Sequence, residues 1–116
     1  MNIEELREYC LSKKAVTEAF PFDDETLVFK VMDKMFLLTN INKELSMNLK
    51  CEPENAIELR EMYPSVLPGY HMNKKHWNTV LIDGSVSDKQ LQEWIDHSYD
   101  EVVRKMTKKM QAELLK

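Results

Sequence analysis

The fold of this chain is decided by residues 26–51, which read TLVFKVMDKMFLLTNINKELSMNLKC. Strand-forming residues recur there with a period of two, the spacing of side chains on one face of a strand. Thr26–Met32 and Met35–Asn40 are predicted strands, joined by a tight hairpin at Asp33-Lys34. Leu45–Cys51 alternates apolar and polar residues, so one face of this strand meets a core and the other meets water. We therefore expect an antiparallel meander.

The residues before the meander predict one helix and one irregular segment. Asn2 and Glu5 have the spacing of a capping pair, and apolar residues recur at helical spacing to about Lys13. Residues 20–25 combine a proline with three acidic residues. Because proline removes a backbone donor, we expect an irregular connection there.

After the meander, the pattern returns to helix and then to strand. Pro53 suits the first turn of a helix that Pro64 ends, and residues 64–69 are predicted as a loop. His76–Ile82 is apolar on both faces, which favours a strand inside the sheet.

Two helix-start signals follow. Ser87 with Gln90 predicts a helix, and Ser98 with Glu101 forms a second capping box within the same run. We therefore expect a kink or a break near His97-Ser98. The final helix is expected to use Val102, Val103, Met106 and Met110.

This order predicts an α+β fold, with an antiparallel sheet and helices packed on one of its faces. At 116 residues the chain is expected to form a single domain, residues 1–116. Two cysteines, Cys10 and Cys51, are most simply reduced thiols. With an acidic, helical N-terminal pattern and no long apolar run, we expect a cytoplasmic protein without a membrane partner.

The composition argues against several functions. Only two glycines are present, which disfavours a phosphate-cradling loop, and no nucleophile has a catalytic context. We expect no enzyme activity, no cofactor and no metal site. The net charge is −4, so any DNA contact must come from a local basic patch. Residues 102–116 supply part of one, with five basic residues against one acidic residue.

The stretch 70–77, YHMNKKHW, carries the densest chemistry of the chain. Lysines can neutralise phosphates, amides and imidazoles can hydrogen bond, and flat rings can stack on bases. A structural role for Trp77 in the core, with solvated lysines beside it, is the competing interpretation. The candidate nucleic-acid-binding residues are Asn73, Lys74, Lys75, His76, Trp77, Arg104, Lys105, Lys108 and Lys109.

The run from Pro68 to Trp77, followed by Asp83-Gly84, resembles the MmcQ/YjbR family of small bacterial proteins. The resemblance covers nearly the whole chain. It implies a CyaY/frataxin-like two-layer sandwich and a "double wing" mode of DNA binding, with hairpins against the duplex. Relatives tend to carry a glycine pair at the hairpin tip, where this chain has Met32-Asp33. Because methionine seldom takes a positive φ, we expect this turn to differ in type.

Three functional hypotheses follow. The first is a DNA-binding protein without enzyme activity. The second is a module that binds a protein partner or a small ligand, with a polar pocket at Tyr70–Trp77. The third is iron handling by analogy with frataxin, which needs an acidic ridge that Glu4, Glu5 and Glu8 supply only sparsely.

Overall fold

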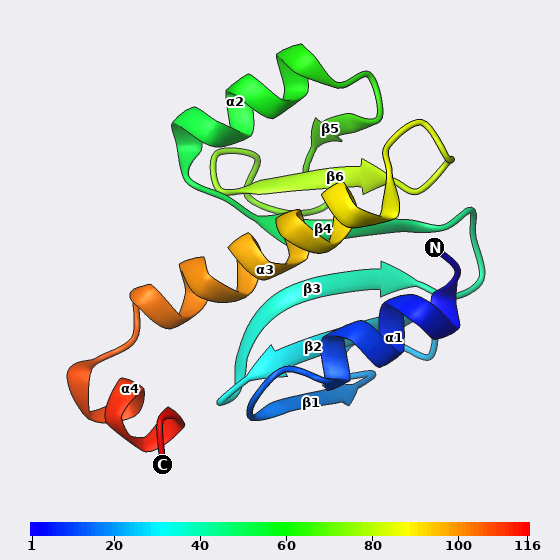
Figure 1. Cartoon of the computed structure of the whole chain (residues 1–116). Coiled ribbons are helices and arrows are strands. Elements are labelled where there is room, and N and C mark those ends of the chain that lie inside the picture. The colour runs from blue at the N-terminus through cyan, green and yellow to red at the C-terminus, as the bar shows by residue number, and fades with distance from the viewer.

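The computed structural model describes all residues, 1–116, as one antiparallel sheet with helices on one of its faces (Figure 1). The sheet has six strands in the order β1-β2-β3-β4-β6-β5. The predicted α+β fold is therefore confirmed. In chain order, the elements are α1 (Ile3–Leu11), β1 (Val16–Ala19), β2 (Thr26–Val31), β3 (Lys34–Asn40), β4 (Ser46–Lys50), α2 (Pro53–Met62), β5 (Val66–Pro68), β6 (Trp77–Leu81), α3 (Asp88–Arg104) and α4 (Lys108–Leu114).

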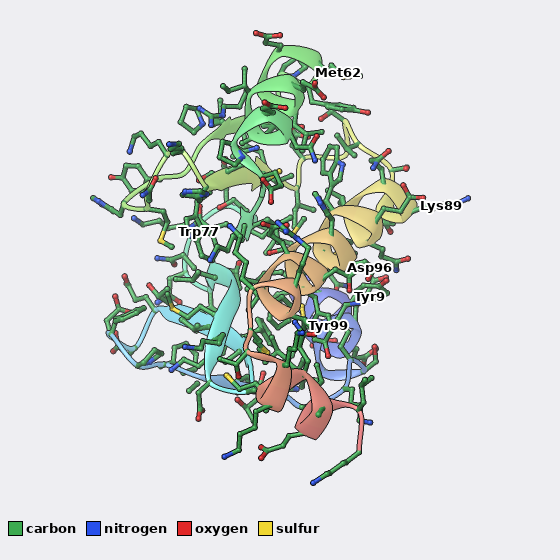
Figure 2. All side chains as sticks on the ribbon, turned by 90° about the vertical axis from the view of Figure 1, so that its left-hand side faces the viewer. Tyr9, Met62, Trp77, Lys89, Asp96 and Tyr99 are labelled. Atoms are coloured by element: carbon green, nitrogen blue, oxygen red, sulfur yellow. The ribbon has the colours of Figure 1, made fainter.

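The main core fills the space between the sheet and the helices. Alternate residues of β2 and β4 point into it, and Leu6 of α1 and Ile95 of α3 pack against them, both with no exposed surface. We call this side of the sheet the covered face. Figure 2 shows α1 and α3 on one side of the sheet and no helix on the other, which we call the open face. Val28, Leu38 and Trp77 form a small apolar cluster on that open face.

The local signals at the start of the chain are confirmed. Asn2 caps α1 and Glu5 completes the reciprocal capping box. The predicted meander is β2, β3 and β4, and β6 lies inside the sheet between β4 and β5. Both predictions depend on short-range patterns, which is why the sequence sufficed.

Two edge strands were not predicted. Val16–Ala19 forms β1, and Val66–Pro68 forms β5 within the segment expected to be a loop. Pro68 lies at the end of an edge strand, where a missing donor costs little. These strands are too short for a periodic signal, and pairing with β2 and β6 holds them in place.

The β2–β3 turn corrects a further expectation. The tight turn is at Met32-Asp33, one residue earlier than predicted, because Val31 pairs with Lys34. Both turn residues have positive φ, 48° and 66°, as a type I′ turn requires. Methionine therefore takes a positive φ here, contrary to the preference on which the expectation of a different turn rested. The twist of the paired strands sets the backbone there, whatever the residue prefers.

A kink or a break was predicted near His97-Ser98, and the break is wrong, because α3 continues to Arg104. A bulge leaves Phe36 without a partner on β2, and the Ser98 hydroxyl donates to the Phe36 carbonyl at 2.6 Å. The Ser98 hydroxyl oxygen also accepts a hydrogen bond from the Lys50 backbone N–H at 2.8 Å. Ser98 therefore satisfies two strand groups from inside the helix. The real break lies at 105–107, where Thr107 caps α4.

Candidate functional site

Residues 69–76, which we call the Tyr70 loop, connect β5 to β6 over the open face. The loop begins with a close backbone approach, in which the Gly69 N–H donates to the Trp77 carbonyl at 2.9 Å. A Cβ atom at position 69 would lie 2.8 Å from that oxygen, so only glycine fits. At the far end, the Trp77 N–H donates to the Asn73 carbonyl at 2.9 Å. The loop is thus held at both ends by its own backbone.

Several side chains of the predicted site hold this loop in shape. The Asn73 amide oxygen accepts from the Lys75 N–H at 2.9 Å, and the Lys74 ammonium donates to the Gly69 carbonyl at 3.1 Å. Arg60 of α2 donates to the Lys74 carbonyl at 2.7 Å. Lys75 remains exposed. The two lysines that were predicted to contact phosphates therefore differ in their side-chain contacts. The Lys74 ammonium is hydrogen-bonded within the loop, whereas the Lys75 ammonium makes no hydrogen bond within the protein.

The two rings at the ends of the stretch have opposite environments. Trp77 is 8% exposed and packs in the open-face cluster, while Tyr70 is 65% exposed and its ring lies 4.0 Å from that of His71. His71 itself has a φ of 57°. His76 is half-buried, and its Nδ1 atom has no hydrogen-bond partner. Tyr70 and His71 are thus the rings presented outward.

Three lysines from separate elements line one hollow at the end of the sheet. The hollow has a volume of about 520 Å³ and adjoins the β2–β3 turn, the end of β4 and the end of α3. We call it the lysine hollow. Lys50 of β4 lies directly opposite Trp77 of β6, so the aliphatic part of the lysine side chain and the indole are neighbours on the same face. The lining residues are Asp33, Lys34, Met35, Lys50, Trp77, Val102, Lys105 and Met106.

Carboxylates already engage two of the four predicted helix cations, Arg104 and Lys105. Arg104 donates to Glu101 at 2.9 Å and also pairs with Glu52, and the Lys105 ammonium lies 3.2 Å from Glu101. Burial alone would raise the pKa of Glu101, but hydrogen bonds, led by that from Arg104, lower it below its ordinary value. The same hydrogen bond raises the pKa of Arg104. These two cations are therefore partly neutralised within the molecule.

Lys108 and Lys109 lie apart from the stretch 70–77. Both are exposed on α4, at the opposite end of the molecule from α2 and the Tyr70 loop (Figure 1). The structure therefore brings only Trp77 and Lys105 of the predicted residues together in the lysine hollow. Lys34 and Lys50 were missed. Lys50 occupies a polar position of the β4 alternation, but only the pairing of β4 with β6 reveals its neighbour.

A second and larger hollow, of about 720 Å³, lies on the open face. We call it the polar groove. Its floor includes Asn48 and Thr79, whose side chains hydrogen bond to each other, and the Thr79 oxygen accepts from the Tyr70 N–H at 2.9 Å. The rest of the lining is Phe22, Asp23, Glu25, Thr26, Met35, Leu38, Thr39, Asn40, Lys43, Ser46, Leu67, Pro68, Tyr70, His71 and Met72.

Other kinds of site find little support. Cys10 and Cys51 are free and buried, and burial raises their pKa values to about 12 and about 11. Neither thiol is thereby suited to nucleophilic chemistry. No three His, Cys, Asp or Glu side chains gather closely enough to hold a metal ion, which leaves the iron-handling hypothesis without a donor set. Among the helices, none has the length and apolar character needed to cross a membrane.

Sequence comparisons identify relatives along most of the chain. A model of the YjbR family matches residues 11–101. The uncharacterised protein YjbR of Escherichia coli (strain K12) is 36% identical over 104 residues, covering 89% of this chain and 88% of its own length. The uncharacterised protein YbdF of Escherichia coli O157:H7 is 35% identical over 109 residues, covering 93% and 89%.

Solved structures with the same fold agree. The crystal structure of the Deinococcus radiodurans protein DR2400, described as a DUF419 domain, superposes with a TM-score of 0.92 and 46% identity. The match covers 97% of this chain and 87% of that one. A crystal structure of a Pseudomonas syringae protein gives a TM-score of 0.76 and 29% identity, over 88% of this chain and 99% of that one.

Proposed function

The chain belongs to the YjbR family, and the relatives named above are uncharacterised proteins. We therefore propose a function from the site. The protein binds DNA through the lysine hollow and catalyses no reaction. The observation that carries the proposal is the convergence of Lys34, Lys50 and Lys105 on one hollow. Ammonium groups placed this way neutralise phosphates without reading base sequence.

The arrangement also supports a wing-like contact. The β2–β3 turn carries Lys34 on one side of the hollow, and the Tyr70 loop carries the exposed Lys75 close to Trp77 in sequence. A phosphate backbone that lies in the hollow would meet the β2–β3 turn and Trp77, the residue that follows the Tyr70 loop. The buried thiols suit a reducing compartment, so we keep the cytoplasm as the proposed location.

The local charge balance sets the expected strength. Asp33 lines the hollow, and Glu101 and Glu52 pair with Lys105 and Arg104. Four cations, counting Arg104, therefore face three carboxylates, which leaves a local balance of +1. We expect binding that is weak and independent of sequence, with a Kd on the order of 10⁻⁴–10⁻⁶ M at physiological salt.

A second candidate function rests on a different observation. The polar groove lies directly beside Tyr70 and His71, and its volume of about 720 Å³ is within the usual range of small-molecule sites. This supports the hypothesis of a ligand-binding module, in which the polar groove is the site and DNA is not the partner.

The test is a salt series of binding to random duplex DNA, measured by fluorescence anisotropy. The test variant is Lys34→Gln, Lys50→Gln and Lys105→Gln combined. A matched control, Lys89→Gln, Lys108→Gln and Lys109→Gln, removes the same charge from exposed lysines outside the hollow. With up to three phosphate contacts, the log–log salt slope of the wild-type protein should be about −2 to −3.

We expect the test variant to lose most of its affinity and its salt slope, and the control to retain both. An equal loss in the two variants would mean that bulk charge binds the DNA and that the hollow is not the site. Absence of duplex binding at low salt would overturn the DNA proposal and favour the ligand-binding module.

A further inference from the structure

The polar groove has features that a duplex phosphate backbone would not use. Its side chains are mostly uncharged hydrogen-bonding groups and rings, and its charged groups are Asp23, Glu25 and Lys43. Two carboxylates against one ammonium group repel phosphates. The charges are thus separated, with cations at the lysine hollow, at the end of the sheet, and the carboxylates Asp23 and Glu25 at the polar groove. Met35 lines both hollows, so the two adjoin.

The exposed rings flank this groove without serving the core. Phe22, from the β1–β2 connection, is 63% exposed, and Tyr70, from the Tyr70 loop, is 65% exposed. Both line the groove, although they are far apart in the sequence. His71 supports the Tyr70 ring, with centroids 4.0 Å apart. Exposed rings of this kind are the surfaces on which single bases stack.

The floor of the groove offers donors that the fold leaves free. The Asn48 amide oxygen accepts from the Thr79 hydroxyl, which fixes the orientation of the carboxamide. Its NH₂ group makes no hydrogen bond within the protein, and neither does the Ser46 hydroxyl. Together with the Glu25 carboxylate, the groove thus offers both donors and acceptors, as the edge of a nucleobase requires.

Bases within a duplex are stacked and paired, so side chains in a groove of this kind reach a base edge only when the base is unstacked. We propose that the polar groove binds one unstacked nucleobase of a single-stranded segment whose phosphates lie at the lysine hollow. The inference rests on the proposed function, because it assigns the phosphates of that strand to the same lysines. It makes single-stranded nucleic acid, and not duplex, the preferred partner.

The experiment compares four labelled or competing probes by anisotropy at fixed salt. They are a short mixed-sequence single strand, its duplex, the same strand with abasic sites, and a free nucleoside monophosphate. The variants are Tyr70→Ala with His71→Ala and, as a matched control, Phe20→Ala, which removes a 44% exposed ring outside the polar groove. Thermal unfolding of each variant confirms that it is folded.

We expect the single strand to bind roughly fivefold or more tightly than the duplex and the abasic strand, because stacking of one base supplies that difference. Tyr70→Ala with His71→Ala should abolish this preference and leave duplex binding unchanged, whereas Phe20→Ala should change neither.

Each contrary result points to a different failure. Equal affinity for the single strand and the abasic strand would overturn the proposal that the polar groove binds a base. It would leave the proposal that the lysine hollow binds phosphates intact. Binding of the free monophosphate without binding of any strand would overturn the inference in favour of a small-ligand site. Absence of duplex binding, even at low salt, would instead overturn the proposed function itself.

Discussion

The covered face and the open face of the sheet differ in the burial and the polarity of their side chains. On the covered face, apolar side chains such as Phe29 and Phe36 have no exposed surface, and the polar Ser98 is fully hydrogen-bonded. On the open face and at the adjoining end of the sheet, amides, hydroxyls and lysines line two hollows, and Tyr70 projects into solvent. Stability therefore resides mainly on the covered face, and binding is proposed for the open face. Substitutions on the two faces should separate these properties.

The largest effect is expected in the covered core. Phe36→Ala removes a fully buried ring that packs edge-on against Tyr99, with centroids 5.4 Å apart. The free energy of unfolding should fall by about 3–5 kcal/mol, as measured by urea denaturation. Salt-dependent DNA binding by the folded fraction should not change. A loss of binding in proportion to the stability loss would mean that the two faces are coupled.

Ser98→Ala tests the same face through hydrogen bonding. The change leaves the Phe36 carbonyl and the Lys50 N–H without their partner. Because both groups would then be unsatisfied, the free energy of unfolding should fall by about 1–3 kcal/mol. Calorimetry of Ser98→Ala against Ser98→Thr separates the lost hydroxyl from altered packing. A neutral Ser98→Ala variant would contradict this role.

The ion pairs of Glu101 predict a pH dependence. The folded protein holds the pKa of Glu101 below its ordinary value of 4.5, so the carboxylate favours the folded state above that pH. This contribution should be lost as the pH falls below 4.5 towards the folded pKa. With partners as exposed as Arg104 and Lys105, we expect roughly 1 kcal/mol at most.

The measurement is urea denaturation of the wild-type protein and Glu101→Gln from neutral pH to pH values below 4.5. The difference between the two should shrink as the pH falls, because protonation removes the charge that the variant already lacks. A difference that stays constant with pH would show that the pairing adds nothing.

The smallest effect is expected at the β2–β3 turn, where Asp33 has a φ of 66°. Asp33→Gly should raise the free energy of unfolding by at most about 1 kcal/mol, because glycine takes this conformation without strain. The same change removes the carboxylate that lines the lysine hollow, so DNA affinity should rise. Asp33→Asn, which removes the charge but keeps the turn chemistry, is the control. Weaker binding by both variants would contradict the proposed role of the hollow.

Sequence patterns predicted most of the covered face and little of the open one. The capping box at Asn2 and the alternation in β4 depend on neighbours within a few residues, so both could be predicted from the sequence. The two Ser98 contacts join α3 to β3 and β4, and no local rule distinguishes them from a capping box. A helix start was therefore predicted where the serine instead satisfies a bulge.

The sequence by itself determined the α+β order of elements, the inward residues of the meander and the unusual density of chemistry at residues 70–77. The tertiary structure decided which of those groups face solvent and which cations meet. Trp77 is buried opposite Lys50 on the neighbouring strand, and Arg104 is paired with carboxylates. Lys34 and Lys105, which are far apart in the sequence, line the same hollow. The physical reason is that strand pairing and the position of the end of α3 determine which side chains become neighbours. Neither produces a periodic pattern in the amino-acid sequence.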